Sequence, residues 1–147
     1  MEKWLKICHT GEMKLVEMPC STEDEYPNTP FLDALYRELN CDSIEIVHAQ
    51  GFRSFLPGRP AIIIDECGKL KDGWEDRINC LCTLMYAPGV DCIVGDALLG
   101  MQLGPELVPF PESVYEDFAK KMVSCFTDCF MKNPCSQGEG KKVEENV

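Results

Sequence analysis

The run from Ala61 to Ile64 constrains the fold of this chain more than any other feature, because it is continuously apolar and largely β-branched. Such a run is typical of a strand buried on both faces, in the centre of a sheet rather than at its edge. Asp65 and the segment Glu66-Cys67-Gly68-Lys69 follow it directly and predict a turn. The chain is therefore expected to build a sheet around this strand.

Further strands are expected on both sides of the central run. Residues 3–8 and 13–18 are short apolar–polar segments around a turn that contains glycine, which predicts a β-hairpin. Residues 42–49 alternate with the period of a half-buried strand, and residues 52–56 follow a further turn. Residues 92–103 are predicted as strand, interrupted by a bulge or turn at Gly95-Asp96.

Three helices are predicted between and after these strands. Thr29-Pro30 is a typical helix start, with Thr29 capping the free amides, and Asn40 is a typical stop. Apolar residues at helical spacing from Trp74 to Met85 predict a short amphipathic helix. Ser113 and Glu116 form a capping-box pattern at the start of a long amphipathic helix that ends near Lys132.

This order of elements predicts an α+β domain at residues 1–133. Its helices are expected to pack on one face of a mostly antiparallel sheet, with a C-terminal amphipathic helix added. Residues 134–147 are rich in Gly, Glu and Lys and predict a disordered tail.

The charge of the chain excludes one class of partner. Its formal net charge is −11, so like-charge repulsion opposes direct binding to a nucleic-acid backbone. The first residues lack the apolar stretch of a secretory signal, and no apolar run approaches the length of a membrane helix. The sequence therefore predicts a cytoplasmic protein that does not engage membranes.

The ten cysteines are expected to be reduced thiols, most of them acting as small core side chains. The closest pairs are Cys80 with Cys82 and Cys125 with Cys129, and neither has the knuckle spacing and turn residues of a zinc site. No metal and no cofactor are therefore predicted, although zinc stays open as the minority alternative.

The sequence contains no complete catalytic motif. His9 and His48 are the only imidazoles, and neither lies in a nucleophile-elbow setting, while phosphate-binding glycine loops are missing. A non-enzymatic protein is predicted, with a Cys- or metal-dependent enzyme as the less favoured alternative.

A small set of side chains matches the chemistry of a nucleotide-like ligand. Aromatic rings can stack on a base, guanidinium groups can pair with phosphate, and an amide can read a ring or ribose edge. The predicted ligand-binding residues are Phe52 and Trp74 for stacking, Arg53, Arg59 and Arg77 for phosphate, and Asn79 for the edge. The alternative is that these arginines are solvated or balance Asp65, Asp72 and Asp76.

Four motifs follow one another along the chain: Ile44-Glu45-Ile46-Val47, Asp65-Glu66-Cys67-Gly68-Lys69-Leu70, Asn79 and Ile93-Val94-Gly95-Asp96. Together they resemble a family of small domains of unknown function that is common in phages and other mobile elements. The resemblance covers about residues 40–100. Cys41-Asp42 replaces a glycine pair usual in the family, and the helix after Ser113 looks like an extension.

The resemblance implies no established activity, but a mobile-element setting implies a small accessory protein that counters host defence. One expectation is a homo-oligomeric, non-catalytic protein that sequesters a nucleotide-derived immune signal, such as a cyclic nucleotide or an ADP-ribose isomer. The alternative is an acidic protein that inhibits a host defence protein by direct interaction.

Overall fold

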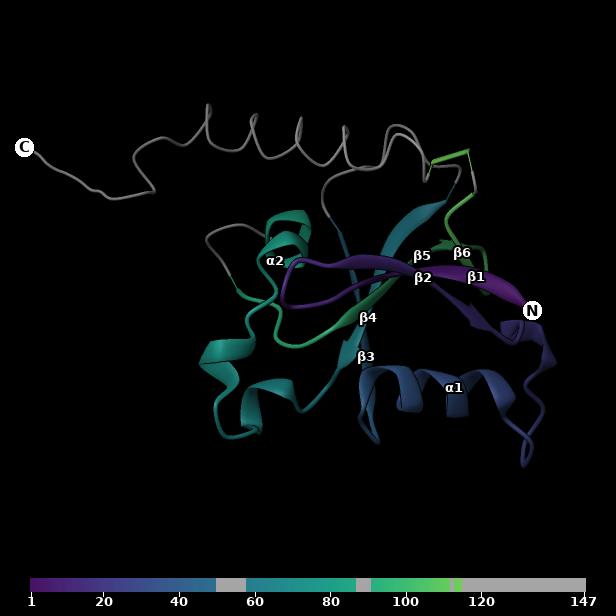
Figure 1. The fold of residues 1–147 in the computed structure, drawn as a ribbon. Helices are drawn as coiled ribbons and strands as arrows, with labels where there is room; N and C mark the ends of the chain where they lie inside the picture. The colour runs from purple at the N-terminus through teal and green to yellow at the C-terminus, as the bar shows by residue number, and fades with distance from the viewer. Residues whose placement is uncertain (50–57, 87–90, 112, 115–147) are drawn as a thin grey trace, which may run out of the picture.

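The computed structural model describes residues 1–49, 58–86, 91–111 and 113–114 (Figure 1). Their α+β class confirms the prediction at that level. The elements, in chain order, are β1 (Glu2–Ile7), β2 (Met13–Met18), the 3-10 turn η1 (Ser21–Glu23), α1 (Pro30–Leu39), β3 (Ile44–His48), β4 (Arg59–Asp65), the 3-10 turns η3 (Gly68–Leu70) and η4 (Trp74–Arg77), α2 (Cys80–Tyr86), β5 (Ala97–Leu103) and β6 (Glu106–Pro109).

The strands form one sheet of six strands in the order β2-β1-β5-β4-β3, with β6 also paired to β5. Every strand pair is antiparallel, as the sequence predicts. β1 pairs with the first half of β5 and β6 with the second half, so both lie on the same side of that strand. The predicted hairpin is β1–β2.

The central position predicted for the Ala61–Ile64 run is confirmed, since β4 lies between β5 and β3. Its alternate side chains enter two separate cores. Ile63 faces the core that includes Trp4 and α1, whereas Ile62 and Ile64 face the core that includes α2. Burial on both faces explains why this strand has no polar alternation.

The prediction that the helices share one face of the sheet is wrong. On one face, Phe31 and Leu35 of α1 pack with Trp4, and the Trp4 and Phe31 ring centroids lie 5.5 Å apart. On the opposite face, Cys82 and Met85 of α2 pack in the other core. The alternating apolar side chains of the central strands require a cover on each face, and one helix supplies part of each.

The boundaries of α1 match the sequence, although a different residue caps it. Asp24 accepts hydrogen bonds from the backbone amides of Phe31 and Leu32, at 2.7 and 3.0 Å. The predicted cap, Thr29, makes no such bond to the backbone. Asn40 ends the helix in the left-handed conformation at φ 51°, which confirms it as the stop.

The predicted helix from Trp74 to Met85 is wrong in its first half. Residues 74–77 form the 3-10 turn η4, and α2 begins only at Cys80. Between them, Ile78 is extended and forms an isolated bridge with Val94. This bridge interrupts the helical path, so the apolar spacing across Trp74 and Ile78 does not reflect one continuous helix.

Two further differences concern the strands near β5. Residues 92–94 do not form the predicted strand, because only Val94 makes a bridge and Gly95 turns the chain at φ +89°. The strand β6 was not predicted. It follows a tight turn at Gly104-Pro105 that places Leu103 opposite Glu106.

Several expectations fall outside the described residues. They are the segment at 52–56, most of the C-terminal helix predicted at 113–132, and the tail at 134–147. Of the helices in the described residues, none has the length and apolar character that a membrane crossing requires.

Candidate ligand-binding site

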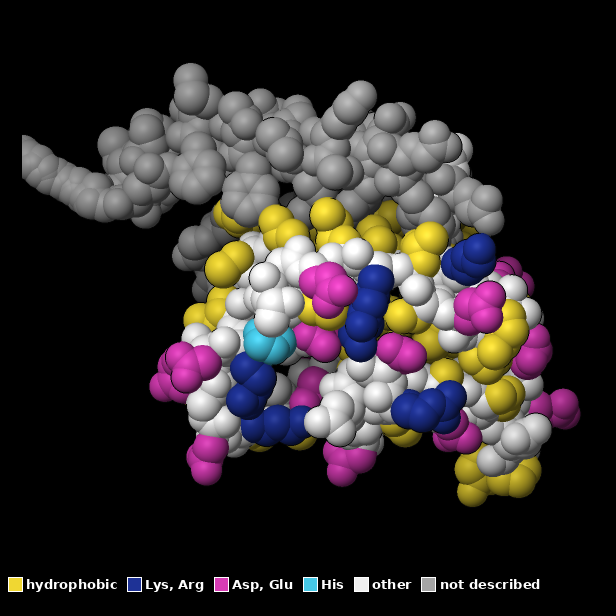
Figure 2. Space-filling model, viewed as in Figure 1, with side chains coloured by type: hydrophobic (Ala, Val, Ile, Leu, Met, Phe, Trp, Pro, Cys, Tyr) yellow, Lys and Arg dark blue, Asp and Glu magenta, His cyan; other side chains and the backbone are white. Residues whose placement is uncertain are grey.

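A cavity of about 470 Å³ opens at the end of the sheet where β1 and β4 end and β5 begins. Figure 2 shows a hollow on this face with lysine or arginine side chains and a histidine at its rim. The volume lies within the range of small-molecule sites, about 300–1,000 Å³. The lining residues are His9, Leu39, Asn40, Asp65, Gly68, Lys71, Asp72, Arg77, Val94, Gly95 and Asp96.

The first wall of the cavity is the turn after β4. Asp65, the last residue of the strand, is 9% exposed and accepts a hydrogen bond from the Cys67 amide at 2.9 Å. Its second carboxylate oxygen lies 2.7 Å from the Lys71 ammonium, which also donates to the Asn40 carbonyl at 3.3 Å. The hydrogen bond that the Lys71 ammonium donates to Asp65 raises the pKa of Lys71. Lys71 therefore stays charged, and its half-exposed side chain bridges the turn and α1.

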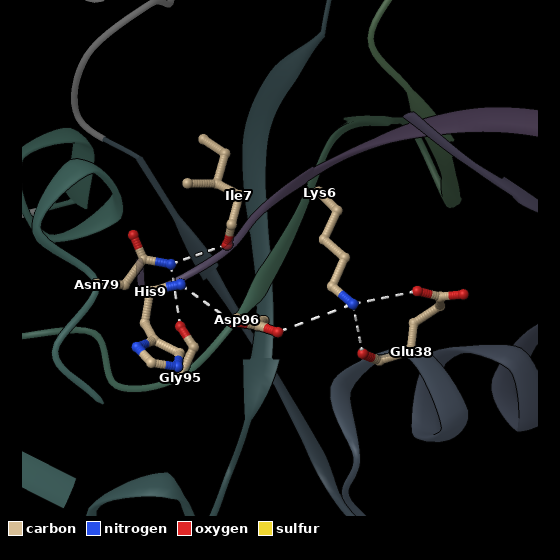
Figure 3. Close-up of polar contacts among 7 residues, drawn as sticks. All are labelled: Lys6, Ile7, His9, Glu38, Asn79, Gly95 and Asp96. Atoms are coloured by element: carbon tan, nitrogen blue, oxygen red, sulfur yellow. Dashed lines mark hydrogen bonds and ion pairs between the residues drawn. The ribbon is translucent and has the colours of Figure 1, made fainter. Parts of the chain in front are cut away.

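The second wall is the segment before β5, and Asp96 holds it in place (Figure 3). One oxygen of Asp96 accepts a hydrogen bond from the His9 amide at 3.0 Å. The other lies 3.8 Å from the ammonium of Lys6, which is 8% exposed and also donates to Glu38 of α1. The carboxylate of Asp96 therefore ties the β1–β2 turn to the cavity wall, and Lys6 connects it to α1.

Asn79 lies behind this wall and joins three segments. Its side-chain nitrogen donates to the carbonyls of Ile7 and Gly95, both at 3.0 Å (Figure 3). Its side-chain oxygen accepts from the Cys82 amide at 3.1 Å and so caps the start of α2. With 1% of its surface exposed and both ends of the amide engaged, Asn79 positions the wall.

Gly68 in the first wall and Gly95 in the second wall are each glycine for a different structural reason. A Cβ atom on Gly68 would lie 3.1 Å from the Val94 carbonyl oxygen, so a side chain there would push the two walls apart. Gly95 has φ +89°, a conformation that L side chains rarely adopt. Two of the motifs that suggested the family resemblance, at 65–70 and 93–96, thus meet at this cavity.

Of the predicted ligand residues, Arg77 lines the cavity. Its Nη2 donates to the Asp72 carbonyl at 3.2 Å. Trp74 begins the same 3-10 turn, η4, and is half-buried, but it is not part of the cavity lining in the described residues. Arg59 begins β4, roughly 20 Å along the strand from Asp65 at about 3.3 Å per residue. Phe52 and Arg53 lie outside the described residues.

Neither Lys71 nor His9 was predicted as a ligand-binding residue. A charged pair on either side of the turn after β4, Asp65 and Lys71, is the signal that could have pointed to this wall. A second, adjacent cavity of about 70 Å³ shares Asp65, Gly68 and Val94 and is too small for a nucleotide.

The described cysteines are free thiols in differing environments. Cys80 is exposed and Cys82 fully buried, and burial raises the pKa of Cys82 strongly. Burial and the charge of Asp96 raise the pKa of Cys8, which precedes His9. Protonated thiols are poor nucleophiles and poor ligands. In the part of the chain that the structure describes, no three His, Cys, Asp or Glu side chains gather as a metal site.

Comparisons with protein-family models, with curated proteins and with solved structures found no match to this chain. The fold and the cavity define an α+β domain with a polar cleft at one end of its sheet.

Proposed function

We propose that this protein is a non-catalytic binding protein that sequesters a small nucleotide-derived ligand in the cavity at the end of its sheet. The observation that carries the proposal is the lining of that cavity: Arg77 and Lys71 lie in the same 470 Å³ space as the carboxylates of Asp65 and Asp96. Cationic side chains can hold a phosphate, and carboxylates can accept hydrogen bonds from ribose hydroxyls or base amino groups.

Arg77 is the principal phosphate-binding residue in this proposal. Among the described residues, its guanidinium donates one hydrogen bond, to the Asp72 carbonyl, so its other N–H donors are available to a ligand. Lys71 adds a second positive charge, which its ion pair with Asp65 partly neutralises. The apolar side chains of Leu39 and Val94 offer contact to a ring.

The three acidic residues of the lining limit the charge of the ligand. Asp65, Asp72 and Asp96 would repel a polyphosphate, whereas a cyclic nucleotide or an ADP-ribose isomer has few negative charges and many hydroxyl groups. This match supports the expectation of a nucleotide-derived immune signal. The proposed setting is the cytoplasm of a host cell that contains a phage or mobile element, where capture of the signal would keep it from its receptor.

Calorimetric titration with cyclic dinucleotides, cyclic mononucleotides and ADP-ribose isomers tests the proposal. Arg77→Ala should weaken binding of the active compound by about tenfold or more, because a charge-assisted hydrogen bond contributes about 1.5–3 kcal/mol. Arg59→Ala is the matched control and should leave the affinity unchanged, since Arg59 is exposed at the other end of β4.

Equal affinity in the Arg77→Ala variant and the wild type would refute the cavity as the site. If no compound binds and the protein instead captures a basic host protein in a salt-sensitive way, the alternative of a protein-interaction inhibitor gains support.

A further inference from the structure

β2 is an outer strand of the sheet. In the described part of the chain, β2 pairs only with β1 and stands last in the strand order. Two of its apolar side chains, Met13 and Leu15, are 39% and 47% exposed. Open strand edges with exposed apolar side chains are sites where another strand can add.

The register of the hairpin determines which backbone groups face outward. At its closed end the Cys8 amide donates to the Glu12 carbonyl at 2.8 Å. Hydrogen-bonded pairs alternate along an antiparallel ladder, so Lys14 and Val16 bond inward to β1. The amide and carbonyl groups of Met13, Leu15 and Glu17 therefore point away from the sheet.

Leu15 also ends a continuous apolar row across one face of the sheet. The paired residues Ile62, Leu99, Leu5 and Leu15 lie side by side on four neighbouring strands. The first three are at most 6% exposed, whereas Leu15 is 47% exposed. The row thus reaches the edge with its last side chain uncovered.

We infer that β2 pairs with β2 of a second copy of this chain, antiparallel and with Leu15 opposite Leu15. In this register each outward-facing residue of one copy lies opposite an outward-facing residue of the other. Met13 of the first copy faces Glu17 of the second, and Glu17 of the first faces Met13 of the second. A two-fold axis perpendicular to the sheet relates the copies and joins their apolar rows through the two leucines. The inference is independent of the ligand-binding cavity, which lies at the end of the sheet.

The neighbouring registers are less favourable. A shift of two residues toward the end of β2 pairs Met13 of one copy with Pro19 of the other, and Pro19 has no amide proton to donate. A shift in the other direction places Gly11, which turns the chain at φ +99°, opposite Glu17. Only the register centred on Leu15 uses all three outward-facing residues of both copies.

The dimer should be weak. Two short strands bury less than the roughly 1,200 Å² of a stable interface. The net charge of −11 on each copy opposes association, so added salt should strengthen the dimer by screening this repulsion. An association that tightens with salt is the opposite of what an acidic surface bound to a basic partner would show.

Sedimentation velocity of the full chain over a wide concentration range tests the inference. We expect a monomer–dimer equilibrium that Leu15→Lys weakens at least tenfold. Ile46→Lys is the matched control, because Ile46 is 38% exposed on β3, the strand at the opposite end of the order, and should leave the dimer intact. Both side chains are substantially exposed, and unchanged unfolding curves would confirm that both variants fold.

Site-resolved amide exchange gives a second readout on the unmodified chain. The amides of Met13, Leu15 and Glu17 should gain protection as protein concentration rises, whereas those of Lys14 and Val16 are already protected by β1. A chain that stays monomeric throughout, a dimer indifferent to Leu15→Lys, or a dimer in which these three amides gain no protection would each overturn the inference.

Discussion

Replacing Asn79 with alanine should lower the free energy of unfolding by about 3 kcal/mol or more. The side chain is 1% exposed and makes hydrogen bonds to Ile7, Gly95 and Cys82. Its removal leaves a buried carbonyl at Ile7, a partly buried carbonyl at Gly95 and the first-turn amide of Cys82 without these partners. Urea unfolding followed by circular dichroism measures the loss.

Two control variants test whether the loss of stability comes from the hydrogen bonds of Asn79 rather than from replacing an asparagine as such. Asn28→Ala removes an exposed side chain whose residue forms backbone bonds with Glu25, and it should change stability by less than about 0.5 kcal/mol. Asn79→Asp keeps the shape but places a carboxylate against two carbonyl oxygens, so it should not restore stability. An Asn79→Ala protein as stable as the wild type would contradict the positioning role.

Replacing Gly100 with valine should destabilise the fold by about 3 kcal/mol or more, because the added atoms have no space. A Cβ atom at this position of β5 would lie 2.5 Å from the Val108 carbonyl oxygen and closer still to the Trp4 indole. Trp4 is fully buried under α1, and Val108 belongs to the adjacent strand, so neither can move without disturbing the core. The midpoint of urea unfolding measures the effect.

Gly104→Asn is the control for this variant. Gly104 has φ +59°, which asparagine tolerates better than other residues, and no atom lies within 4 Å of its ideal Cβ position. A stability change within about 0.5 kcal/mol is expected for this surface substitution. Equal destabilisation by both variants would show that the close approach of Trp4 to Gly100 is not the cause.

The elements that the sequence predicts best are those with strong local signals. The apolar run at Ala61–Ile64, the hairpin and the limits of α1 follow from periodicity, a glycine turn and helix-end residues. The break before α2 was not predicted because its cause is not local. Ile78 leaves the helical path to bridge Val94, and this contact appears only once the chain has folded.

The cavity itself was not predicted, for the same reason, and only Arg77 of its lining was among the predicted ligand residues. Arg77 was predicted from its chemistry, but Asp96 and His9, which line the same cavity, come from segments distant in the sequence. Asn79 was predicted as a ligand residue. It also stands directly before an apolar helical segment, where a helix cap is expected, and in the structure its side chain caps α2. Residue type alone does not distinguish these roles, since an amide can serve either.

The opposite faces occupied by α1 and α2 illustrate a further limit. Each helix has its own apolar stripe, and the stripe predicts burial without indicating which face of the sheet it covers. The alternation of Ile62 and Ile63 between the two cores carries that information, but only in combination with the sheet topology.

The central claim is that this protein holds a nucleotide-derived molecule without altering it. Its most direct test is to load the full chain with the compound that binds in the calorimetric panel, remove unbound compound by gel filtration, and release the remainder by heat denaturation. Mass spectrometry should recover the compound intact and in stoichiometric amount. Recovery of a cleaved or rearranged product, or conversion of the compound by substoichiometric protein, would contradict the claim.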